Sequence, residues 1–178
     1  MVKDIDGAGR VGPWWLAWEI ALVAVVAAVA IPFGAAGSGV VPGELAALTA
    51  AAIEKVSPAE HHAHGHTVAA TDRVICGVHV FGFEPSTATK LADVHTVYGY
   101  YFCAVGAPGL TYDASARADG PVVVQLGPTP VVRIVPAGAG YQERVRAIMP
   151  DEYEAACFAG LPDPAVATAV RARYESTP

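Results

Sequence analysis

Basic residues are scarce in this chain, and that scarcity excludes one large class of partner. Only 11 of the 178 residues are lysine or arginine, against 17 aspartates and glutamates, so the formal net charge is −6. A protein that binds nucleic acid needs a basic face to meet the phosphate groups. We therefore expect no nucleic-acid partner.

The motifs of common enzyme classes are also missing. The sequence contains no GxSxG, no HExxH, no Walker loop and no GxGxxG that follows a strand, so nothing marks a nucleophile, a catalytic zinc or a phosphate cradle. We expect no catalytic residues and no enzymatic activity. An enzyme of a type that carries none of these motifs is the less favoured alternative.

One long apolar run is present, and it begins at Trp14 and ends at Phe33. Glu19 is its only charged residue, and three tryptophans cluster at its start. Twenty helical residues at about 1.5 Å each span roughly 30 Å, the thickness of a hydrocarbon core. Indole rings favour the headgroup level. The run therefore predicts a transmembrane anchor at residues 14–33.

Basic residues near this run predict its orientation. Lys3 and Arg10 precede it, and no basic residue follows until Lys55. Basic flanks stay in the cytoplasm, so residues 1–13 are expected to be a cytoplasmic tail of a single-pass protein of the cell membrane. A cleaved signal peptide, with a small-residue site at Ala28–Ala30 or at Ala35 and Ala36, is the alternative. Both interpretations place the remaining chain outside the cytoplasm.

Small residues also line one face of the predicted anchor, at Ala17, Ala21, Ala24 and Ala28. Such a stripe lets a second helix approach closely. It predicts a protein partner in the membrane or envelope, and the general abundance of alanine is the alternative explanation.

Residues 34–72 are expected to be a linker that contains one short helix and a histidine-rich segment. The start is rich in small residues, and apolar residues at helical spacing predict a helix at 44–56 that Pro58 ends. His62, His64 and His66 would project to the same side of an extended chain. Imidazole suits zinc or copper, so these three residues are a candidate metal site. The favoured interpretation is a solvated segment without a cofactor.

Residues 73–178 predict an exported α+β domain. Apolar, β-branched and aromatic runs at 73–83 and 94–105 indicate two strands, and 121–126 with 131–135 indicate a hairpin after a long loop at 106–120. Helical segments follow at 141–149, from 150 onward, and from 163 to about 175. We expect a four-stranded antiparallel sheet with helices packed on one face.

The three cysteines suggest a disulfide in that domain. If the first two strands form a hairpin that turns near residues 85–90, Cys76 lies opposite the region 101–103, so Cys76 and Cys103 are the predicted pair. Such a bridge is typical of small exported domains. A bridge between Cys103 and Cys157 is the alternative, and otherwise Cys157 is left as a buried thiol or an intermolecular link.

Three segments carry a resemblance to a family. VYGYYFC, GPVVVQL and GAGYQERVRAIMP together resemble a family of small exported or membrane-anchored actinobacterial proteins of unknown function. The likeness covers about residues 73–160 and is carried by Cys76, Cys103, Gly140, Tyr141 and Pro150. It implies a location in the cell envelope and supplies no activity. The expected function is a membrane-anchored, extracytoplasmic binding or accessory protein.

Overall fold

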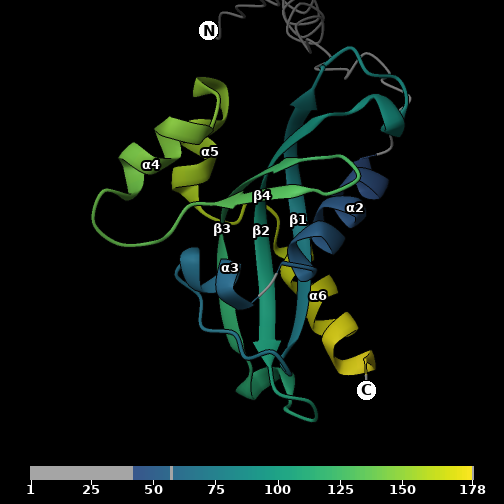
Figure 1. Ribbon diagram of the computed structural model, residues 1–178, viewed down its shortest axis with the longest axis vertical. Coiled ribbons are helices and arrows are strands. Elements are labelled where there is room, and N and C mark those ends of the chain that lie inside the picture. The colour runs from purple at the N-terminus through teal and green to yellow at the C-terminus, as the bar shows by residue number, and fades with distance from the viewer. Residues whose placement is uncertain (1–41, 57, 178) are drawn as a thin grey trace, which may run out of the picture. The chain divides into compact units, whose positions relative to one another are not determined.

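The computed structural model describes residues 42–56 and 58–177. They form an α+β domain in which helices pack on a four-stranded antiparallel sheet (Figure 1). The predicted tail at 1–13 and the predicted anchor at 14–33 lie outside the described residues. Within the part of the chain that is described, no helix combines the length and the apolar character that a membrane span needs.

The helices and strands follow one another in a simple order. They are α2 (Pro42–Glu54), α3 (Pro58–Ala63), β1 (Arg73–Glu84), β2 (Thr96–Gly106), β3 (Ala116–Gln125), β4 (Val131–Ile134), α4 (Tyr141–Ile148), α5 (Asp151–Ala159) and α6 (Pro164–Ser176). Short 3₁₀ helices at Leu91–Asp93 and Tyr112–Ala114 lie in the connections before β2 and β3.

The sheet is a meander with the strand order β1-β2-β3-β4, which confirms the predicted four antiparallel strands. The prediction of a loop up to residue 120 is wrong, because β3 begins at Ala116. The polar start of β3 has little strand propensity of its own. It pairs because β2 extends to Gly106 and offers a partner edge, with Val105 opposite Ala116.

Helices cover both faces of the sheet, and the expectation of one covered face is wrong. On the front face, α2 places Ile53 in a core cluster with Cys103 and Val122. On the back face, α6 packs Val170 against strand residues, and α4 and α5 pack there with residues such as Cys157. Because successive strand residues point to opposite faces, strands that are apolar on both faces bury both under helices.

The described part of the segment expected to be a linker, which begins at Pro42, packs as part of this domain. Leu45 and Ile53 of α2 are fully buried, with 0 % exposed surface. Pro58 begins a helix, a position that suits proline because its missing N–H is not needed there. The core therefore starts before residue 73, where the exported domain was expected to begin.

A disulfide joins Cys76 to Cys103, and the predicted pairing is confirmed. The two residues are direct partners in the β1–β2 register, with Cα atoms 4.1 Å apart. Cys157 is free and buried in the back-face core, while Cys103 belongs to the front-face core. The sheet itself separates these two sulfurs, which excludes the alternative pairing.

We expect the double substitution Cys76→Ala and Cys103→Ala to lower the free energy of unfolding by about 3–4 kcal/mol, because the bridge closes a loop of 27 residues. Urea denaturation of the full-length protein in mild detergent measures the loss. Cys157→Ala is the control, since it removes a buried sulfur without opening a loop. If reductant lowers the midpoint of the wild type no more than that of the double variant, the bridge contributes nothing.

Candidate functional site

The two edges of the sheet differ, and the β1 edge is closed at the disulfide. The 4.1 Å separation of Cys76 and Cys103 is typical of an antiparallel pair that shares no hydrogen bonds, so the polar backbone groups of Cys76 point outward. Its amide donates to Glu54 Oε1 over 2.8 Å, and Arg173 Nη1 donates to its carbonyl over 2.6 Å. Arg173 Nη2 also pairs with Glu54 Oε1 at 3.0 Å. Side chains from α2 and α6 therefore occupy this edge.

The opposite edge, at β4, is open. The Val135 amide donates to the Pro121 carbonyl, and Arg133 pairs with Val123. Because alternate residues of an antiparallel strand bond to the neighbouring strand, Val132 and Ile134 direct their N–H and C=O groups away from β3. No described residue forms a hydrogen bond with these outward groups.

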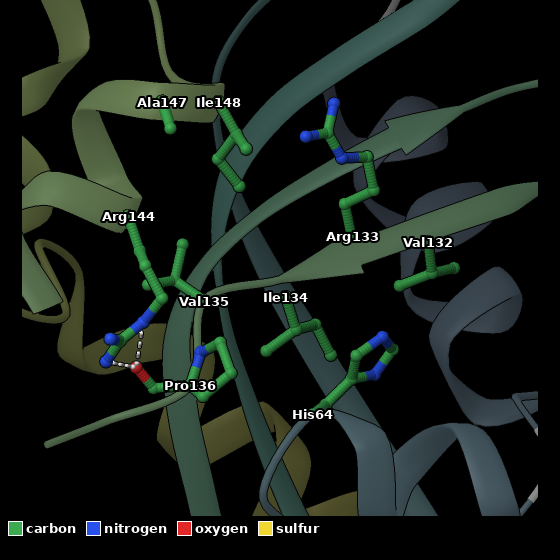
Figure 2. A pocket seen from close by; sticks show the side chains of 9 residues that line it. All are labelled: His64, Val132, Arg133, Ile134, Val135, Pro136, Arg144, Ala147 and Ile148. Atoms are coloured by element: carbon green, nitrogen blue, oxygen red, sulfur yellow. Dashed lines mark hydrogen bonds between the residues drawn. The ribbon is translucent and has the colours of Figure 1, made fainter. Parts of the chain in front are cut away.

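A groove runs along this open edge (Figure 2). It has a volume of about 290 Å³, and its floor is the run from Val132 to Pro136. Three residues of α4 (Arg144, Ala147 and Ile148) lie on one side of the strand, and His64 lies on the other (Figure 2). We call this feature, lined by these nine residues, the edge groove.

The edge groove is positively charged. Arg144 donates to the carbonyls of Pro136 and Ala139 over 2.7 Å and 2.6 Å, which fixes the guanidinium but leaves its charge without a carboxylate. Arg133 is exposed. Among the described residues, neither arginine forms a salt bridge. The lining itself contains two arginines and no aspartate or glutamate, on a chain whose net charge is −6. Glu60, outside the lining, acts on His64.

The structure separates the three histidines of the candidate metal site. His62 is exposed on α3, His64 faces the edge groove, and Nε2 of His66 shares a 2.5 Å hydrogen bond with the hydroxyl of Tyr101. Part of the segment is helical, so the projection of an extended chain does not apply. In the described ranges, no three histidine, cysteine or acidic residues are placed to hold a metal ion. A zinc or copper site stays a prediction without geometric support.

Burial sets the protonation of this histidine segment. It is the main cause that lowers the pKa of His61, His64 and His66 below the 6.5 of a free imidazole, and charge on neighbouring histidines adds to the effect for His61 and His66. Glu60 opposes it at His61 and His64, and Asp119 opposes it at His66. His61 is only 3 % exposed, and its Nε2 is buried without a partner. Burial therefore favours the neutral rings of His61, His64 and His66.

The free cysteine lies outside the edge groove and is unreactive. Burial, followed by the nearby Glu154, raises the pKa of the Cys157 thiol to about 11. A thiol in that state is protonated at neutral pH and is a weak nucleophile.

No family model, curated protein or solved structure matches this chain. The resemblance to exported actinobacterial proteins therefore stays a prediction, and the function has to be inferred from the geometry of the domain.

Sequence reasoning missed the edge groove and its two arginines. A signal was present in β4, a short segment with Arg133 in its middle and prolines at positions 130 and 136. Prolines at both ends are typical of an edge strand. The position of Arg144 beside it depends on where α4 packs, which no local pattern indicates.

We expect the protein to lose stability below about pH 6.5. The folded-state pKa values of His61, His64 and His66 are lowered, so the unfolded chain binds protons first as the pH falls. Their stabilising contribution is complete above the unfolded pKa and declines below it, by at most about 1.4 kcal/mol per pH unit for each proton. Thermal unfolding from pH 8 to pH 5 measures this slope.

The control for this titration comes from the same helix. His61→Gln should flatten the decline, whereas His62→Gln, at an exposed position, should leave it as it is in the wild type. Equal slopes in all three proteins would mean that other groups cause the acid sensitivity.

Proposed function

We propose that this chain is a single-pass, membrane-anchored domain outside the cytoplasm that binds an anionic partner of the cell envelope in its edge groove. The apolar run at residues 14–33 and the basic residues before it support the location. The disulfide between Cys76 and Cys103 supports it too, because such bridges persist in oxidising compartments.

One observation carries the binding role, namely the contrast between the two sheet edges. At Cys76, Glu54 and Arg173 occupy the β1 edge with a carboxylate and a guanidinium that neutralise each other. The lining of the β4 edge includes Arg133 and Arg144 and no carboxylate, and neither arginine forms a salt bridge with a described residue. Uncompensated charge beside unpaired backbone favours a ligand of opposite sign, because complementary potentials steer and align the encounter.

The lining of the edge groove also favours binding over catalysis. Its nine residues include no carboxylate, thiol or hydroxyl group. His64 is the only side chain among them that titrates near neutral pH, and a lone imidazole has no nucleophile there to activate. The groove can hold and orient a ligand through charge, backbone groups and apolar contact.

The location is tested with one accessible thiol. In a Cys157→Ala background that keeps the native disulfide, Thr168→Cys adds a thiol at an exposed position of α6. We expect a membrane-impermeant maleimide to label this protein in intact cells. Labelling that requires broken cells would place the domain in the cytoplasm and refute the proposed location.

The binding site is tested by crosslinking in native membranes. A photoreactive residue at Val131, which is 50 % exposed at the start of β4, should give a defined crosslinked product. Arg133→Glu should reduce its yield at least about fivefold, since a reversed charge repels an anionic partner. The matched position is Ala169, exposed on α6, where only background is expected. A Val131 product that is insensitive to Arg133→Glu would contradict the proposed site.

A further inference from the structure

We infer that the edge groove binds an extended, acidic peptide segment of a partner protein, which joins the sheet as a fifth strand beside β4. This inference rests on the proposed function and specifies its ligand. It combines three features of the groove, which are its unpaired backbone, the length of strand that is free to pair, and the different side chains on the two sides of that strand.

The unpaired backbone calls for a polypeptide ligand. Val132 and Ile134 each direct one donor and one acceptor away from β3. Ile134 buries its side chain in the front-face core, and an edge strand with unpaired N–H and C=O groups is a template for another strand. An added strand supplies up to about four backbone hydrogen bonds in the register of a sheet. A small anion supplies none of that ladder.

The length of the bound segment follows from the prolines. Pro130 and Pro136 flank β4 and cannot donate backbone hydrogen bonds. Arg144 already occupies the carbonyl of Pro136. Pairing is therefore confined to the run from Val131 to Val135, which suits a ligand segment of about five residues. A limit of this kind also protects the edge against open-ended aggregation.

The two sides of β4 specify different ligand side chains. Arg133 lies opposite Val123 of the back-face core, and α4 brings Arg144 to that side. Ile134 belongs to the front-face core, where the lining continues with Val132 and His64. Because an added strand alternates its side chains between the two sides, acidic residues would face the arginines and apolar residues would face Ile134.

A second copy of the chain is a less suitable occupant. The antiparallel register that overlaps the whole run from Val131 to Val135 with its copy pairs Val132 with Ile134 and places Arg133 opposite Arg133. Like charges in directly opposed positions destabilise a pair of strands. An acidic segment meets the same position with opposite charge.

The test uses the full-length protein in nonionic detergent and a fluorescein-labelled peptide of about seven residues in which valine and glutamate alternate. Fluorescence anisotropy measures the dissociation constant. We expect saturable binding that weakens about tenfold or more when the glutamates become glutamines, the equivalent of about 1.4 kcal/mol. Arg133→Glu should weaken binding similarly. Lys90→Glu, a charge reversal at an exposed loop position, should leave it unchanged.

Backbone pairing is tested separately from charge. Two further peptides carry N-methyl groups on alternate residues, one in each phase, so that one of them loses the donors that face β4. We expect that peptide to lose binding and the other to keep it. Val132→Pro should weaken the unmodified peptide in the same way, since it removes an outward N–H without removing a bond to β3. The N-methylated pair decides the matter if this variant does not fold.

Each remaining outcome overturns the inference in a distinguishable way. Binding that depends on Arg133 but tolerates both N-methylated peptides would refute strand addition and leave an anion-binding groove. If the peptide does not bind but the crosslink at Val131 in membranes still depends on Arg133, strand addition is likewise refuted and an anion-binding groove remains. Loss of both signals would refute the proposed function as well. A Val131 crosslink between two copies of the chain would identify the copy as the occupant and overturn the peptide.

Discussion

Cys76 is the residue on which the arrangement of the domain depends. Its side chain is bonded to Cys103, and both polar groups of its backbone are held by Glu54 and Arg173. Strand β1, strand β2, helix α2 and helix α6 thus meet at a single position. A strand can neither slip against its neighbour nor accept a new one where its edge is occupied in this way. At β4, by contrast, no described residue forms a hydrogen bond with the outward backbone groups of Val132 and Ile134.

Two arginines make similar contacts with opposite consequences. Arg173 and Arg144 each donate to backbone carbonyls, and each fixes a segment of chain by doing so. Arg173 also meets a carboxylate, that of Glu54, so its field is cancelled locally. Arg144 donates only to backbone carbonyls and forms no salt bridge with a described residue. An exposed ion pair adds little stability, and the more important effect of this difference is on where the surface is positively charged.

Features that depend on residue spacing and local strand propensity were predicted from the sequence, whereas features that depend on tertiary packing were missed. The disulfide followed from counting residues across a hairpin, and the four strands followed from β-branched runs. The start of β3 was missed because Arg117 and Asp119 have no strand preference and pair only since β2 continues beside them. The histidine segment was read as extended because its helix is stabilised by the burial of His61. The edge groove was invisible because it is bounded by segments about 80 residues apart, from His64 to Arg144.

Gly82 connects the back of the sheet with this distant edge. It lies at the irregularity in the register between β1 and β2, and a side chain there would collide with the hydroxyl of Tyr153 on α5. Helix α5 contacts α4, which in turn forms one wall of the edge groove. The distance between α4 and β4 thus depends in part on Gly82 of β1, which has no side chain that would displace α5. The shape of the edge groove therefore depends on a residue that does not line it.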